Sequence, residues 1–183
     1  MSDEHSQALR SVIREKIAAH RLLPEPPRSV LTRAGRWQPC DGCGAPITPE
    51  ERESEAEMAS GQALRLHAAC FVIWQDEAAR HVAALIRAKV VDGTLPVPAA
   101  PPGKLWVGNG SGLPCDGCGQ PITVAQIEYE PDLPGHSPAL RFHQKCLELW
   151  QQQRTEYRGM GGASDVASIV HVRDDWAQPA PSR

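Results

Sequence analysis

The sequence contains one cysteine pattern written twice, and this duplication restricts the fold more than any other feature. Residues 40–48 recur at 115–123 with eight of nine letters identical, and residues 64–75 recur in looser form at 140–151. Each copy reads Cys-x2-Cys, a gap of 23 or 24 residues, then His-x2-Cys, and the pattern uses all six cysteines of the chain. An internal repeat of this kind indicates that one structural unit occurs twice.

Each copy of the pattern offers three thiols and one imidazole, which is a complete tetrahedral ligand set for zinc. The predicted metal ligands are Cys40, Cys43, His67 and Cys70 in the first copy, and Cys115, Cys118, His143 and Cys146 in the second. Four protein ligands leave no open coordination position, so the sequence predicts two structural zinc ions per chain. With only 41% hydrophobic residues, a chain of 183 residues would find a single large core hard to assemble, and structural metal is a common remedy.

Three other uses of the cysteines compete with zinc. Disulfides would leave one cysteine per copy unpaired and both histidines without a role, and they are rare in reducing compartments. A thioredoxin-like redox pair needs an αβ pattern that neither copy carries. An iron–sulfur cluster explains the histidines less readily than zinc does. Zinc is therefore the cofactor that the sequence favours.

Apolar residues at helical spacing predict three helices. The first helix covers residues 6–21, a long second helix runs from 70 to 90, and the third covers 143–158. Residues 13–17 resemble residues 86–90, so each copy of the cysteine pattern has a helix-like segment upstream of it. The long second helix is expected to run from the first copy into the lead-in of the second.

The gap between each cysteine pair and its histidine is expected to form short strands. In the second copy, alternating residues around 126–130 and 140–142 predict a hairpin. The first copy offers a returning strand around 64–66. Its outgoing segment, 55–58, is a weaker strand candidate, and a helix over 49–59 is the competing prediction.

A cysteine knuckle, a hairpin and a helix beginning at His-x2-Cys resemble the treble-clef zinc finger, specifically the first zinc half of a LIM domain, over 40–75 and 115–151. A LIM domain continues with a second Cys-x2-Cys module, whereas this chain continues into helix after each last ligand. Cys-x2-Cys-Gly, His-x2-Cys and a tryptophan four residues later (Trp74 or Trp150) are also similar to short bacterial proteins with no established activity. Both tryptophans are expected to pack over the metal sites.

The resemblance implies a small α+β fold with two tandem treble-clef-like zinc modules, joined by the long helix and a Pro-rich spacer. The expected segments are a helix and Pro/Arg-rich lead-in (1–39), the first zinc module (40–91), a Pro/Gly-rich linker (92–114), the second zinc module (115–158) and a Gly-rich break with a partly disordered tail (159–183). Treble-clef proteins bind proteins or nucleic acids, so the fold alone selects no function.

Charge and composition favour a protein partner over a nucleic acid. The net charge of −3 lacks the global positive field of a nucleic-acid binder. Residues 1–39 nevertheless carry seven Lys/Arg against four Asp/Glu, with arginines at 10, 14, 21, 28, 33 and 36. The preferred hypothesis is a non-enzymatic protein-interaction adaptor or regulator of unknown partner. A nucleic-acid-binding regulator is the alternative, and a thiol or zinc redox sensor is the second alternative.

No catalytic residues are predicted, and the chain is not expected to be an enzyme. The glutamates of 50–57 are interpreted as a solvated acidic face because of their density. The stretch 108–112 lacks the lysine of a phosphate-binding loop and is interpreted as a flexible joint. The N-terminus is polar and no long apolar run is present, so we expect a cytoplasmic protein without membrane contact.

Overall fold

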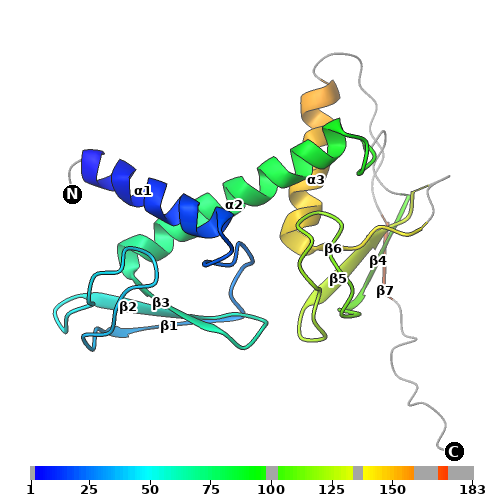
Figure 1. Cartoon of the computed structure of the whole chain (residues 1–183). Helices are drawn as coiled ribbons and strands as arrows, with labels where there is room; N and C mark the ends of the chain where they lie inside the picture. The colour runs from blue at the N-terminus through cyan, green and yellow to red at the C-terminus, as the bar shows by residue number, and fades with distance from the viewer. Residues whose placement is uncertain (1–2, 98–102, 134–137, 159–168, 173–183) are drawn as a thin grey trace, which may run out of the picture. The chain divides into compact units, whose positions relative to one another are not determined.

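The computed structural model describes residues 3–97, 103–133, 138–158 and 169–172. The chain divides into two compact units, Met1–Val82 and Ala83–Arg183, and the boundary falls inside a helix. Figure 1 shows the small sheet of each unit with its helices. The architecture is therefore α+β, with three helices and two small sheets in the described part of the chain.

The first unit is a three-stranded antiparallel sheet accompanied by helices. The chain forms α1 (Asp3–Ala18), β1 (Ser29–Ala34), β2 (Arg52–Glu57) and β3 (Ala63–His67), and α2 (Ala68–Val91) begins directly after β3. The sheet order is β1-β2-β3, and Figure 1 shows α1 and the first half of α2 on one side of this sheet. The direct step from β3 into α2 fixes the position of the His-x2-Cys segment.

Apolar side chains from α1, β2, β3 and α2, together with loop residues, form the core of the first unit. Ile13 and Ile17 of α1 are fully buried, as are Leu64 and Leu66 of β3. Trp74 of α2 is 1% exposed, and its indole N–H donates a hydrogen bond to the Leu23 carbonyl oxygen at 3.0 Å. The tryptophan thus packs in the core, as the sequence indicated, and ties α2 to the segment that follows α1.

The second unit repeats this plan with one added strand. It contains the end of α2, then β4 (Lys104–Asn109), β5 (Ile127–Pro131), β6 (Phe142–His143), α3 (Gln144–Arg158) and β7 (Ile169–Val172), with sheet order β6-β5-β4-β7. β7 pairs with β4 in parallel, whereas the other pairs are antiparallel. Trp150 is fully buried, stacks on Phe142 and donates its indole N–H to the Pro96 carbonyl oxygen at 2.9 Å.

The end of α2 plays the same part in the second unit that α1 plays in the first. Lys16 of α1 donates to the backbone carbonyl of Asp41 at 2.7 Å, and Lys89 of α2 donates to that of Asp116 at 2.6 Å. Both helices end in the same way, because the backbone N–H of a buried leucine, Leu22 or Leu95, donates to the carbonyl of this lysine. One helix therefore serves as the last element of the first unit and the lead-in of the second.

Two strands occur in the expected lead-in and the expected linker, where the sequence predicts none, and β7 occurs in the expected tail. β1 lies in the expected lead-in 1–39, and β4 lies in the expected linker 92–114, including part of the expected flexible joint 108–112. Both become strands because β1 pairs with β2 along its full length and β4 pairs with β5 from Leu105 to Asn109. The competing helix over 49–59 is wrong, since β2 occupies this segment. Of 159–183, only residues 169–172 are described.

Within the described part of the chain, no helix is both long and apolar enough to span a membrane.

Candidate metal centres

Each cysteine pair lies in a tight turn held by backbone hydrogen bonds. In the first unit, the Gly44 N–H donates to the Cys40 carbonyl at 2.7 Å, and the Cys40 N–H donates to the Ala45 carbonyl at 2.8 Å. Gly44 has a φ of 84°, which is costly for a residue with a side chain. The second unit repeats these bonds at Cys115, with Gly119 at a φ of 78°. This turn brings the two thiols of each pair close together, on the side where the other ligands of the cluster lie.

The aspartate between the two cysteines ties the turn to the strand that carries the histidine. Asp41 accepts a hydrogen bond from the Arg65 N–H at 2.6 Å, and its own N–H donates to the Arg65 carbonyl at 2.8 Å. Asp116 makes the same two bonds with Arg141, at 2.6 and 2.8 Å. The aspartate therefore holds the cysteine turn at a fixed distance from the strand that carries the histidine. The spacing of the cysteines does not predict this role.

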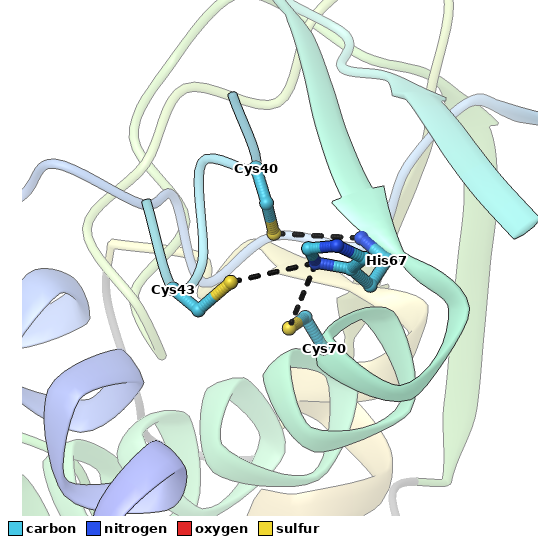
Figure 2. Close-up of side chains that lie close together, drawn as sticks. All are labelled: Cys40, Cys43, His67 and Cys70. Atoms are coloured by element: carbon cyan, nitrogen blue, oxygen red, sulfur yellow. Dashed lines mark hydrogen bonds between the residues drawn. The ribbon is translucent and has the colours of Figure 1, made fainter. Parts of the chain in front are cut away.

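The histidine and the third cysteine reach the site from the junction of strand and helix. His67 ends β3, and Cys70 lies in the first turn of α2. Figure 2 shows the His67 ring among the three thiols, with its Nδ1 atom 3.4 Å from Cys43 Sγ and 3.8 Å from Cys70 Sγ. The His67 backbone N–H donates to Cys40 Sγ at 3.4 Å. In the second unit, His143 Nδ1 lies 3.5 Å from Cys118 Sγ.

The structure brings all eight predicted ligands into two separate clusters. In each cluster the four ligand atoms lie within 4.8 Å of one another, which is close enough to surround a single ion. The members are Cys40, Cys43, His67 and Cys70 in the first cluster, and Cys115, Cys118, His143 and Cys146 in the second. No disulfide joins these cysteines. Both clusters could hold a metal ion, and three thiols with one imidazole are the donor set of a structural zinc site.

The electrostatics of the first cluster favour a bound cation. A hydrogen bond from Cys70 lowers the pKa of Cys40 to about 4, against the opposing effect of burial. The pKa of Cys70 is raised because it donates this bond to Cys40, and burial raises it further. One thiolate thus forms readily, and its charge opposes ionisation of the next thiol. A dication at the centre removes that opposition, so metal binding and thiol ionisation are coupled.

The second cluster has the same electrostatic pattern. Hydrogen bonds from Cys118 and Cys146 lower the pKa of Cys115, while the pKa of Cys146 is raised by its bond to Cys115. Burial alone would lower the pKa of His143, but hydrogen bonds and charge interactions with Cys115 and Cys118 raise it to about 10. The sulfur atoms thus stabilise a positive charge on the imidazole, and a metal ion bound by the same atoms would be stabilised in the same way.

The two histidines differ in what contacts the ring nitrogen that faces away from the thiols. His67 Nε2 lies 3.5 Å from the Glu51 carboxylate, which also accepts the Thr48 N–H at 2.9 Å. Gln126 takes the corresponding place in the second unit and accepts the Thr123 N–H at 2.9 Å. His143 Nε2 is buried without a hydrogen-bond partner among the described residues. A carboxylate on the outer nitrogen orients a metal-binding histidine, so the first site has a support that the second lacks.

The acidic residues of 50–57 are not a uniformly solvated face, contrary to the sequence interpretation. Glu53 is 0% exposed, and its carboxylate accepts hydrogen bonds from Arg33 at 3.0 Å and Arg36 at 3.3 Å. Its counterpart Glu128 is 2% exposed and accepts from the Ser111 hydroxyl at 2.6 Å. Each unit therefore buries a glutamate in an inner strand of its sheet, and the identical position in both copies is the signal that could have directed attention to it.

A groove opens beside the first cluster. It has a volume of about 660 Å³ and lies between the first half of α1 and the cysteine turn. Its walls include apolar residues of α1 and of the turn, together with three of the four ligands of this cluster and Glu51. The first cluster is therefore reachable from outside along an apolar path.

In comparisons with known proteins, no family model matches the chain, and no curated protein or solved structure is significantly similar to it.

Proposed function

We propose that the protein binds two structural zinc ions and acts, without catalysis, by presenting the two metal-stabilised units to a protein partner. The observation that carries the zinc assignment is the ligand set itself, in which four protein atoms lie within 4.8 Å of one another. A closed set of this kind leaves no coordination position for a substrate. When bound, the zinc supplies cross-linking of the cysteine turn to the strand–helix junction.

Metal analysis of the purified chain tests the zinc assignment. We expect two zinc ions per chain, and one ion each for His67→Ala and His143→Ala, because three thiolates without the imidazole hold the metal less tightly. His81→Ala is the matched control, since this histidine lies on α2 away from both clusters and should leave the count at two. A count near zero or near four for the unaltered chain would overturn the assignment.

Exposed apolar side chains in the first unit support the adaptor role. Val30 and Leu31 of β1 are 44% and 56% exposed, and Trp37 is 63% exposed. Val30 and Leu31 are consecutive residues of a strand and point to opposite faces, so β1 offers a large exposed apolar side chain on each face that a protein partner could cover. Trp37 also has a φ of 62°, where its counterpart is Gly112 with a φ of 79°. A tryptophan retained in a conformation that favours glycine is consistent with a role outside the core.

The nucleic-acid alternative is disfavoured by the placement of the N-terminal arginines. Arg10 and Arg14 pair with the buried carboxylate of Glu77, at 3.1 and 2.9 Å. Arg33 and Arg36 pair with the buried Glu53, at 3.0 and 3.3 Å. These four guanidinium groups thus form ion pairs inside the first unit, and their positive charge is less available to bind phosphates.

Site-specific photo-cross-linking separates the two partner classes. A cross-linker at Leu31 should trap a protein from cell extract, and the product should persist after nuclease treatment. A cross-linker at Val124, which is 76% exposed in the second unit, is the control and should not give this product. Loss of the Leu31 product with nuclease would favour a nucleic-acid-dependent role, and equal products at both positions would contradict the proposed surface.

A further inference from the structure

The two clusters have the same ligand types but different access to solvent. Cys43 is exposed, whereas its counterpart Cys118 is half-buried and the other four cysteines are buried. His67 is half-buried, whereas His143 is buried. A reagent that attacks sulfur therefore reaches the first cluster more easily than the second, and it reaches Cys43 before the other thiols.

The path to Cys43 is apolar and has the size of a small organic molecule. The groove of about 660 Å³ is lined on one side by Ala8, Leu9 and Val12 of α1, and on the other by Ala45 and Pro46. Cavities of this volume accommodate drug-sized ligands, and an apolar lining favours apolar ones. The groove thus combines an exposed sulfur atom with an apolar surface that favours an apolar reagent.

We propose that the first cluster is a modification site, at which an organic hydroperoxide with an apolar group enters this groove and oxidises Cys43. The oxidation releases the metal of the first cluster and leaves the second cluster intact. This inference depends on the proposed zinc binding and assigns different roles to the two sites, the first responsive and the second purely structural.

The chemistry balances without any further reactant. The Cys43 thiolate attacks the terminal oxygen of the hydroperoxide, so that an S–O bond forms and the O–O bond breaks. Sulfur loses two electrons, and the departing alkoxide takes a proton from solvent to become an alcohol. A thiolate of Cys40 or Cys70, both within 4.8 Å, then attacks the sulfenic acid. An S–S bond forms, the S–O bond breaks, and hydroxide leaves as water after protonation.

Loss of the metal follows from the loss of ligands. The disulfide removes two of the four donor atoms from the first cluster, so the remaining thiol and imidazole hold zinc poorly. Reduction of the disulfide by a dithiol restores the three thiols and the binding site. The Glu51 contact to His67 keeps the imidazole in place for rebinding.

The experiment uses the full chain loaded with zinc and compares cumene hydroperoxide with hydrogen peroxide. Zinc release is followed with a metallochromic indicator, and oxidised cysteines are trapped with dimedone and located by mass spectrometry. We expect one of the two ions to be released, with label or disulfide at Cys43. Cumene hydroperoxide should act about tenfold faster than hydrogen peroxide, because a buried aromatic ring contributes binding of that order.

A groove-filling variant separates the role of the groove from simple exposure. Ala8 lines the groove and is not a metal ligand, and Ala8→Phe should slow the reaction with cumene hydroperoxide more than the reaction with hydrogen peroxide, so that the preference is lost. Ala18→Phe, on an exposed position of the same helix outside the groove, is the matched control and should retain the preference. Both variants should still bind two zinc ions.

The outcomes distinguish this inference from the proposed function. Fewer than two zinc ions before oxidation would contradict the zinc assignment itself. Three results would overturn the hydroperoxide site while leaving structural zinc binding in place. These are release of both ions at equal rates, oxidation mapped first to the second cluster, and an unchanged preference for cumene hydroperoxide in Ala8→Phe. Selective release of one ion, with label at Cys43 and a preference lost only in Ala8→Phe, would support it.

Discussion

Two glycines show how closely the backbone is packed just before each cysteine turn. A Cβ atom on Gly35 would lie 2.3 Å from the Thr48 carbonyl oxygen, and one on Gly110 would lie 2.1 Å from that of Thr123. These are main-chain atoms in both cases, so the strain cannot be relieved by rotating a side chain. The position requires glycine in both copies because the strand passes directly against the segment that follows the turn.

We expect Gly35→Ala and Gly110→Ala each to lower the free energy of unfolding by about 1–3 kcal/mol, the usual cost of overpacking. Urea unfolding of the zinc-loaded chain measures this change. Gly103→Ala is the control, because no heavy atom lies within 4 Å of its added Cβ, and its effect should be small. Unchanged stability in both variants would mean that the backbone moves apart more easily than the contacts indicate.

The metal-site candidates could be identified from the sequence, but much of their surroundings could not. Cysteine and histidine spacing predicts the ligands because the chemistry depends on residue type alone. Asp41 and Glu53 recur at the same positions of both copies, which marks them for attention, but the recurrence does not show which groups pair with them. The buried carboxylate of Glu53 is paired with Arg33, which lies opposite it on β1, a strand that the sequence does not predict.

At the scale of elements, one carboxylate joins α1 to α2. The Glu77 side chain is 1% exposed and accepts from Arg10 at 3.1 Å and Arg14 at 2.9 Å. Burial alone would raise the pKa of Glu77, but the hydrogen bonds from Arg14 and Arg10 outweigh it and lower the pKa below the ordinary value of 4.5. The stabilisation is therefore complete above about pH 4.5 and is lost as the pH falls through the lowered pKa.

Glu77→Gln should lower the stability at pH 7 by roughly 1–3 kcal/mol, the range for hydrogen bonds to a charged group, reduced by the exposure of both arginines. The difference from the unaltered chain should shrink below pH 4.5, because protonation then removes the same charge. Thermal unfolding between about pH 3 and pH 7, in the presence of zinc, measures both effects. Glu15→Gln, on the exposed face of α1, is the control, and an equal pH dependence in both variants would contradict the prediction.

Trp74 connects α2 to the segment that follows α1, and Trp150 connects α3 to the segment that follows α2. Trp74→Phe and Trp150→Phe should each cost about 1–3 kcal/mol of unfolding free energy, because a half-buried carbonyl loses its hydrogen-bond donor. Chemical denaturation with fluorescence detection gives the values. Trp37→Phe should stay within about 0.5 kcal/mol, since this side chain is 63% exposed. A larger loss at Trp37 than at the buried positions would refute the assignment.

Helices were easier to predict than strands in this chain, for a physical reason. Helical periodicity is local, so the sequence predicts helices over 6–21, 70–90 and 143–158, and the structure has α1, α2 and α3 close to these bounds. β1 and β4 depend on pairing with β2 and β5, which lie well downstream in the sequence. Both lie next to proline-rich stretches, whose composition is typical of linkers, so the local residues carry no comparable signal for them.

At the scale of the whole molecule, α2 belongs to both units. A fragment of residues 1–91 contains the first unit with all of α2, and we expect it to fold and to bind one zinc ion. A fragment of residues 1–67 lacks Cys70 and α2, so it should bind zinc weakly and remain unfolded. Circular dichroism and metal analysis of both fragments measure this. An unfolded 1–91 fragment in excess zinc would show that the first unit depends on the rest of the chain.

Because α2 belongs to both units, a further unit could be added to this architecture without any new type of connecting segment. α3 stands in the second unit where the start of α2 stands in the first, and α2 enters the next unit simply by continuing for a few more turns. A designed chain in which α3 is continued by the sequence 83–158 would place a third metal set after the second. The protein is, in this sense, an array of two repeats that one uninterrupted helix connects.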